Sequence, residues 1–324
     1  MSNLSLWHIN STHSELREEP TPLQQESMAE EKIIHSLYSL ISTGTEKMVA
    51  LGKVDDRLSE KMSVPYMDGN FNLPIKYGYS LVGKTLDNTL VHLLHPHQQI
   101  AKVSSDALFT LPNDIPARRL TLVSNMETIV NALWDSEHLL LNDSNTINVA
   151  ICGFGNIGAL LACTLHQLEI TNITIIEADH WRRHKAASLG FEVQSSEQPL
   201  DEFDLIYHTT CSSSGLQWCI QSAAFEGTIV ELSWYVDKPV SIMLGEHFHY
   251  NRLKLISSQV SNIPKHKPKE SYVSRKSYAI ELLRQSIYDE LFADDVLLAD
   301  SPDFFKAMRS GNTPNGIIWC IKYP

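Results

Sequence analysis

Three glycines with Gly-x-Gly-x-x-Gly spacing stand near the middle of the chain, at Gly153, Gly155 and Gly158. An apolar run precedes them and an apolar-periodic stretch follows, so the pattern predicts a strand, a tight turn and a helix. The first glycine allows the turn, the second lets the backbone approach a pyrophosphate, and the third lets helix and strand pack closely. The helix would begin at Asn156 and Ile157, and its N-terminus would face the phosphates.

An acidic residue follows the next predicted strand, 172–176, nineteen positions after the last glycine. A carboxylate at this place, Glu177, can accept hydrogen bonds from the adenosine ribose and disfavours a 2′-phosphate, which predicts NAD rather than NADP. Arg182 complicates this prediction, because its side chain can reach the ribose or its phosphate, or lie on a solvated helix turn. The alternative for the whole pattern is a phosphate-free turn with an incidental acid.

Two polar pairs follow later strands of the same region: Thr209-Thr210 and Ser233-Trp234. Strands alternate with helices across 147–259, which predicts a parallel, doubly wound sheet. Ligands bind at the carboxyl ends of the strands in such sheets. All four residues are therefore expected to contact the cofactor, with Trp234 as a wall of the substrate site.

Composition narrows the class of protein. The chain has 324 residues, enough for two domains, and a net charge of −12, which argues against nucleic acid or an anionic membrane as partner. No apolar run reaches the roughly 18–20 residues that span a bilayer. The N-terminus lacks a basic start, and the five cysteines include no Cys-x-x-Cys pair. We expect a cytoplasmic protein whose partner is a small-molecule substrate.

The first part of the chain contains many short predicted strands separated by glycine and proline, typical of a small β-barrel-like domain. The last part contains helices and a final strand, 317–323. We therefore expect one domain made of 1–122 and 268–324, and a dinucleotide-binding domain at 123–267.

Four segments carry a resemblance to a known family: "ISTGTE" at 41–46, "GYSLVG" at 78–83, Met126-Glu127-Thr128, and the glycine motif. Together with the domain order they resemble the medium-chain dehydrogenase/reductase superfamily. The likeness is greatest to the branch with bacteriochlorophyllide a dehydrogenase and zinc-binding dehydrogenases. It implies an α/β protein with a GroES-like β-rich catalytic domain and a Rossmann domain, and hydride transfer with NAD(P). Homodimers through the edge of the nucleotide-domain sheet are common in this family.

The chain departs from that family at the zinc ligands. Zinc members have a cysteine where this chain has Ser42-Thr43, and a His-Glu pair where it has Tyr79-Ser80. Only Glu127 remains, near the place of the third ligand. Zinc needs three protein ligands, so we expect no zinc. A site rebuilt from His95 or His97 with Glu127 stays an alternative.

Hydride transfer without a metal needs side chains that stabilise or move a proton on the substrate oxygen. The resemblance places near the cleft Thr43, Thr45, Glu46, Tyr79 and Glu127. His97 lies in the densest histidine cluster of the first domain, and a histidine side chain can serve as a general acid–base. Each has a structural alternative: Tyr79 can fill the vacated metal pocket, an imidazole can bond to backbone, and Glu127 can be a favourable charge near a helix start.

These residues predict a zinc-independent, NAD(P)-dependent oxidoreductase that acts on a carbonyl or secondary alcohol. One alternative is a zinc-free reductase of enones or quinones, which would prefer NADPH. Another is a dinucleotide-binding scaffold or sensor that has lost catalysis.

Overall fold

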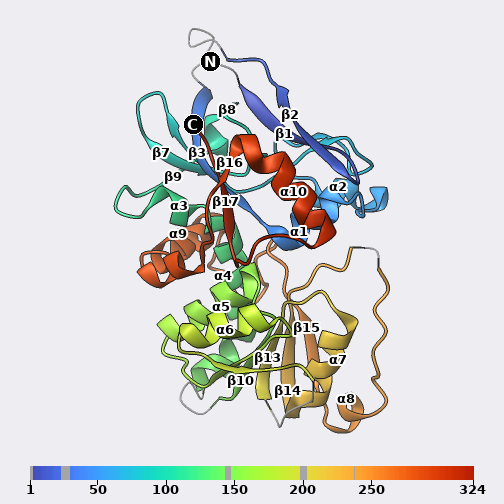
Figure 1. Cartoon of the computed structure of the whole chain (residues 1–324). Helices are drawn as coiled ribbons and strands as arrows, with labels where there is room; N and C mark the ends of the chain where they lie inside the picture. Colours follow the sequence, from blue (N-terminus) through green and yellow to red (C-terminus); the bar gives the residue numbers. More distant parts are fainter. Residues whose placement is uncertain (1–2, 23–29, 143–146, 198–202, 237) are drawn as a thin grey trace. The chain divides into compact units, whose positions relative to one another are not determined.

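The computed structural model describes residues 3–22, 30–142, 147–197, 203–236 and 238–324 (Figure 1). It divides into two compact units, which are described separately: unit 1 comprises Met1–Ser124 and Leu283–Pro324, and unit 2 comprises Asn125–Leu282. The segment 268–282, expected in the first domain, groups with unit 2 in this division.

Unit 1 is rich in β-structure. Its strands are β1 (Leu4–Asn10), β2 (His13–Glu18), β3 (Glu31–Ile41), β4 (Asp68–Gly69), β5 (Ile75–Lys76), β6 (Leu81–Thr85), β7 (Leu90–Leu93), β8 (Ile100–Ser104), β9 (Phe109–Thr110), β16 (Val296–Leu297) and β17 (Trp319–Lys322). Its helices are α1 (Thr43–Ala50), α2 (Ser59–Met62), α3 (Ala117–Leu120) and α10 (Ser301–Ser310).

These strands form a four-stranded sheet, β2-β1-β5-β4, and a seven-stranded sheet, β16-β17-β3-β6-β7-β9, with β8 paired to β3. The strand β3 organises the larger sheet because it pairs with β6, β8 and β17. Buried side chains from β3, β6, β7 and β8 pack together, among them Ile34, Leu81, Val91 and Val103. Ile41, at the end of β3, is fully buried, and α1 begins two residues later at Thr43.

Unit 2 alternates strands and helices, as the sequence predicts. Its strands are β10 (Val149–Cys152), β11 (Ile173–Ile176), β12 (Glu192–Gln194), β13 (Phe203–His208), β14 (Ala223–Glu231) and β15 (Lys254–Ser257). Its helices are α4 (Val123–Asn142, whose first two residues fall in unit 1), α5 (Asn156–Gln167), α6 (His180–Ser188), α7 (Ser213–Ser222), α8 (His247–Tyr250) and α9 (Tyr272–Leu282).

The six strands of unit 2 form one sheet in the order β12-β11-β10-β13-β14-β15, and every neighbouring pair is parallel. Figure 1 shows α5 and α6 to one side of these strands and α7 to the other. A parallel sheet covered on both faces requires apolar strands, and all residues of β10 and β11 are buried. Successive strands are added on one side of β10 up to β12 and on its other side from β13 onward, so the strand order reverses between β10 and β13. Open α/β sheets bind their ligands at such a point of reversal.

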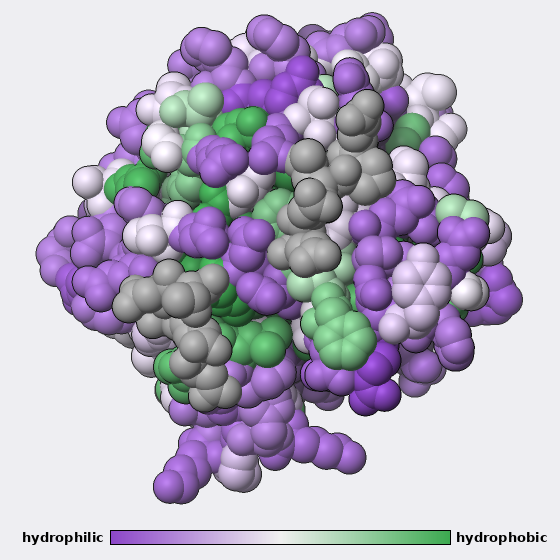
Figure 2. Space-filling view, turned by 90° about the horizontal axis from the view of Figure 1, so that it is seen from below, coloured by the Kyte–Doolittle hydropathy of each residue, from purple (hydrophilic) through white to green (hydrophobic). Residues whose placement is uncertain are grey.

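Figure 2 shows one face of the molecule that is mostly hydrophilic, with hydrophobic side chains gathered at several places among the polar ones. Among the described residues, no helix has both the length and the apolar content needed to cross a membrane.

Candidate functional site

The glycine turn has the geometry that the motif predicts. Gly153 follows β10 with φ of +104°, a conformation that side chains rarely adopt. A Cβ at Gly158 would lie 1.9 Å from the carbonyl oxygen of Gly153, so only glycine fits. Gly155 is the N-cap of α5, which begins at Asn156 and continues through Ile157. The turn therefore presents backbone at the N-terminus of a twelve-residue helix.

Glu177 stands directly after β11, and its carboxylate is tied to the glycine turn. Its Oε2 accepts a hydrogen bond from the Phe154 backbone N–H at 2.7 Å, and its Oε1 accepts one from Asp179 N–H at 2.9 Å. Each carboxylate oxygen has two acceptor sites, so capacity for a further donor remains. The buried carboxylate thus holds the turn in place and still offers acceptor sites.

The two arginines of α6 lie differently. Arg183 donates from Nη1 to the carbonyl oxygen of Glu177 at 2.8 Å, which fixes the end of β11. Arg182 instead lies beside the glycine turn, because its Nη1 would be 3.8 Å from a Cβ at Gly155. Asp179 caps the helix through the Arg182 backbone N–H. Of the two arginines, Arg182 is therefore the one that lies nearer to the expected phosphates.

The polar pairs after β13 and β14 lie at the carboxyl edge of the sheet. Thr209 donates from Oγ1 to the carbonyl oxygen of Cys152 at 3.0 Å, so it braces the glycine turn. Ser233 accepts from the Cys211 backbone N–H at 3.0 Å, and Trp234 accepts at its carbonyl oxygen from the Cys211 thiol. Thr210 is exposed, and its hydroxyl hydrogen-bonds to His208, the last residue of β13, which directly precedes the Thr209-Thr210 pair.

In unit 1 a buried chain of hydrogen bonds links residues from both ends of the sequence. His97 Nε2–H donates to Glu46 Oε2 at 2.8 Å, and Ser39 Oγ–H donates to His97 Nδ1 at 2.7 Å. Ser39 lies 2.8 Å from the Tyr323 hydroxyl. Donor and acceptor roles follow from the network as a whole. Glu46 and His97 side chains are 1% and 0% exposed, so the pair is shielded from solvent.

Tyr79 lies at the partly exposed side of this chain. Its phenol hydrogen-bonds to the side chains of Ser42 and Thr45, and Glu46 accepts from the Ser42 backbone N–H at 2.8 Å. Burial, reinforced by the Glu46 charge, raises the pKa of Tyr79 to about 12. The phenol therefore stays protonated near neutral pH and is available as a hydrogen-bond donor. Thr43, the first residue of α1, is partly buried in the same segment.

Glu127 lies in unit 2, on α4, and has cationic partners there. Its Oε1 accepts from Arg275 Nε at 3.3 Å, and its Oε2 lies 3.6 Å from Lys276 Nζ. Arg275 also donates to the Asn131 side chain at 3.0 Å. Thr43, Thr45, Glu46, Tyr79 and His97 are thus brought together in unit 1, whereas Glu127 is held in an ion-pair network of unit 2.

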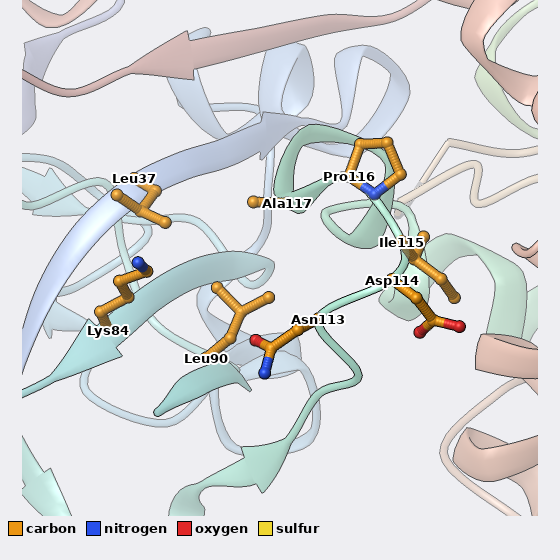
Figure 3. Close-up of a pocket in the computed structure, with 8 residues that line it drawn as sticks. All are labelled: Leu37, Lys84, Leu90, Asn113, Asp114, Ile115, Pro116 and Ala117. Carbon is orange, nitrogen blue, oxygen red and sulfur yellow. The ribbon is translucent and has the colours of Figure 1, made fainter. Parts of the chain in front are cut away.

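Unit 1 also has a pocket of about 500 Å³ that contains none of the expected site residues. Figure 3 shows Lys84 of β6 and Leu90 of β7 on one side of it, and the segment before α3 on the other. A second pocket, of about 320 Å³, is lined by Lys76, His95 and Gln98 among others. His95 donates from Nδ1 to the Pro96 carbonyl oxygen at 2.8 Å, and burial lowers its pKa to about 4.

Four residues of these hydrogen-bond networks were not predicted from the sequence: Ser39, Tyr323, His208 and Glu231. Ser39 and Tyr323 meet only because β3 pairs with β17, which the sequence does not reveal. His208 and Glu231 are directly opposite in the parallel register of β13 and β14. A histidine and an acid at the last positions of two successive strands were a usable signal. Among the described residues, no group of three or more histidines, cysteines or acids is arranged to hold a metal ion.

Comparison with known proteins shows which solved structures have a similar fold. No family model matches the sequence, and no curated protein matches it significantly. Solved structures match over nearly the whole chain. An Escherichia coli CFT073 protein described as a short chain alcohol dehydrogenase, complexed with NADH, has TM-score 0.75 and 12% identity, covering 99% of this chain and 100% of that one.

Two further structures are similar. A protein from Sinorhizobium meliloti 1021, assigned as a zinc-binding dehydrogenase and bound to NADP, has TM-score 0.77 and 13% identity, with 99% of each chain covered. The 2R,3R-butanediol dehydrogenase of Bacillus subtilis has TM-score 0.72 and 15% identity, again with 99% of each chain covered. The chain therefore has the same α/β fold as these dehydrogenases.

Proposed function

We propose that this protein is an oxidoreductase that transfers a hydride between a nicotinamide cofactor and a carbonyl or secondary alcohol. The observation that carries the proposal is the glycine turn after β10. Its glycines leave the backbone uncovered by side chains, and the turn lies where the strand order of the parallel sheet reverses. Similar folds with NADH and with NADP support it. The cofactor would supply the hydride acceptor or donor, and the protein would bind and orient it.

We propose NAD as the preferred cofactor. Glu177 follows β11, where the adenosine ribose is expected, and a 2′-phosphate on that ribose would meet the negative charge of its carboxylate. Arg182 lies beside Gly155 and so is suited to the pyrophosphate instead. This division of roles between the acid and the arginine is what favours NAD.

We propose that catalysis does not use zinc. The positions where the family has ligands carry hydroxyl groups here, on Ser42, Thr43 and Tyr79, which are poor zinc ligands in comparison with cysteine and histidine. Glu127 is occupied by Arg275 and Lys276. The donor set therefore does not fit the metal, and no catalytic step is assigned to it.

In place of a metal, Tyr79 would donate a hydrogen bond to the substrate oxygen. Its phenol is protonated, is oriented by Ser42 and Thr45, and is backed by the buried Glu46–His97 pair. A donor placed where negative charge develops lowers the barrier most when it is already oriented. The chain from Tyr323 through Ser39 to His97 would hold Glu46 in position without contact with the substrate.

The first test is cofactor binding. With six tryptophans, intrinsic fluorescence can follow titration with NADH and with NADPH. We expect tighter binding of NADH. Gly158→Val should abolish binding, whereas Gly245→Ala, where nothing lies within 4 Å, should not change it. Failure of the wild-type protein to bind either cofactor would contradict the proposal.

The second test is turnover of secondary alcohols, starting with 2R,3R-butanediol, and of carbonyl compounds, with NAD(H). Reduction of quinones or enones with a preference for NADPH would favour the double-bond reductase instead. Tight cofactor binding with no turnover of any alcohol, carbonyl, enone or quinone would favour the catalytically silent scaffold.

We also propose a cytoplasmic homodimer. The strand β15 stands at one end of the sheet of unit 2, and its Leu255 is 37% exposed. An open edge can pair with the same edge of a second copy about a two-fold axis. Light scattering coupled to gel filtration should give twice the chain mass, and Leu255→Asp should shift it toward the monomer; a wild-type monomer at micromolar concentration would contradict this proposal.

A further inference from the structure

A hydroxyl, an imidazole and a carboxylate lie in line at the carboxyl edge of unit 2. Thr210 Oγ1 is 2.6 Å from His208 Nε2, and His208 Nδ1 is 2.8 Å from Glu231 Oε2. The His208 side chain is fully buried, Glu231 is 14% exposed, and Thr210 is exposed. The three groups thus lead from the surface to a buried acid.

The hydrogen bonds around the imidazole determine its protonation. Glu231 is an acceptor, so Nδ1 carries the proton, and Nε2 is left as an acceptor for the Thr210 hydroxyl. Glu231 also accepts from Ser233 N–H at 2.7 Å and from the Tyr235 hydroxyl at 3.2 Å. This is the arrangement by which an acid orients an imidazole and the imidazole accepts a proton from a hydroxyl.

The surrounding backbone is shaped to this contact. His208 and Glu231 are register partners at the ends of β13 and β14, so their side chains emerge on the same face. A Cβ at Gly215, in the first turn of α7, would lie 2.5 Å from Thr210 Oγ1 and 2.8 Å from His208 Nε2. Glycine at this position leaves room for the hydroxyl–imidazole contact.

The other titratable groups nearby remain uncharged at neutral pH. Burial, together with the Glu231 charge, raises the pKa of Tyr235, so its phenol remains a donor. Burial also raises the pKa of the thiols of Cys211 and Cys219. Within this cluster, the Nε2 of His208 is the acceptor that the Thr210 hydroxyl contacts.

We propose that Thr210, His208 and Glu231 form a proton relay for the hydride-transfer reaction, with Thr210 in contact with the reacting hydroxyl group. The inference rests on the proposed function. The relay lies on β13 and β14, on the other side of the reversal point from the strand that carries Glu177. A dinucleotide that begins at Glu177 and crosses the glycine turn ends over these strands with its nicotinamide half.

The proton transfer balances in the direction of alcohol oxidation. The substrate O–H bond breaks and its proton goes to Thr210 Oγ1, while the Thr210 proton forms a new bond to His208 Nε2. The substrate carbon loses its hydride to NAD⁺, so the alcohol is oxidised and the cofactor reduced. Glu231 stabilises the imidazolium that results, and the proton returns to water through the exposed threonine.

The kinetic test uses the full-length protein with NAD⁺ and 2R,3R-butanediol or another secondary alcohol that it oxidises. Thr210→Val should lower kcat about 100-fold, and Thr210→Ser should keep kcat within about threefold of wild type, because serine retains the hydroxyl. Thr171→Val, at an exposed threonine before β11, is the matched control. His208→Gln should also lower kcat, because it removes the ring nitrogen that accepts from the Thr210 hydroxyl. Unchanged kcat in Thr210→Val and His208→Gln, with normal cofactor binding, would overturn the relay.

A second measurement judges the relay without turnover. In protein labelled with ¹⁵N-histidine, NMR should show His208 with its proton on Nδ1, and Thr210→Val should shift the Nε2 resonance. A proton on Nε2, or no shift in the variant, would overturn the relay. A wild-type protein that shows these signals and binds NADH yet oxidises no alcohol would contradict the proposed function alone.

Discussion

Tyr79 is the residue on which the proposed chemistry most depends. It has a phenol where the resembling family has a metal-ligating histidine, and burial raises the pKa of Tyr79 to about 12. Tyr79→Phe removes the donor but keeps the ring packed on Tyr77. We expect kcat to fall by about 100-fold with a small change in KM, as for loss of one preorganised donor. Steady-state kinetics against the control Tyr38→Phe would check this, and an unchanged kcat would show that the ring only fills space.

Gly158 lets helix α5 approach the end of β10. Gly158→Ala places a methyl group 1.9 Å from the Gly153 carbonyl oxygen, so the helix must move away from the turn. We expect the variant to lose at least about 2 kcal/mol of unfolding free energy, as in other overpacked sites, and to bind NADH more weakly. Urea unfolding and fluorescence titration measure the two effects. Normal NADH affinity in the variant would mean that the cofactor does not bind at this turn.

At the scale of elements, features that depend on neighbouring segments could be predicted from the sequence. The glycine turn and the acid after β11 lie on consecutive elements, and the alternation of strands and helices predicted the parallel sheet. The Ser39–Tyr323 contact joins residues 284 positions apart, so no local pattern shows it. His208 and Glu231 meet through strand register, which depends on how β13 and β14 are aligned. The residues predicted from the sequence in this region were their neighbours Thr210 and Ser233.

Helix α9 packs on α4 through a buried ion pair. Arg275 is 3% exposed and donates to Glu127 and Asn131, which explains why 268–282 groups with unit 2. Arg275→Met leaves a buried carboxylate with Lys276 as its remaining cation, and we expect a loss of about 3 kcal/mol in unfolding free energy. Arg252→Met breaks an exposed pair with Glu226 and should cost less than about 1 kcal/mol. Equal effects of the two variants in urea unfolding would contradict the structural role of Arg275.

At the scale of the whole molecule, two buried histidines make stability depend on pH. Burial, followed by the Arg309 charge, lowers the pKa of His8 well below its usual value, and burial lowers that of His95 to about 4. Both imidazoles stay neutral in the folded protein but take up protons near pH 6.5 once the chain unfolds. The unfolded state therefore binds more protons below pH 6.5, so stability is full above this pH and falls as the pH drops.

Between pH 7 and pH 5 each of these histidines should cost about 2 kcal/mol of unfolding free energy, since 1.5 pH units below 6.5 correspond to about that amount. The Arg57 side chain lowers the pKa of the Asp55 carboxyl to about 2, so protonation of Asp55 affects stability only at a lower pH than this range. Urea unfolding at several pH values measures the slope. His8→Asn and His95→Gln should each make the slope shallower, and His180→Gln, at an exposed helix start, should not. A slope that is the same in all three variants would mean that groups other than His8 and His95 take up the protons.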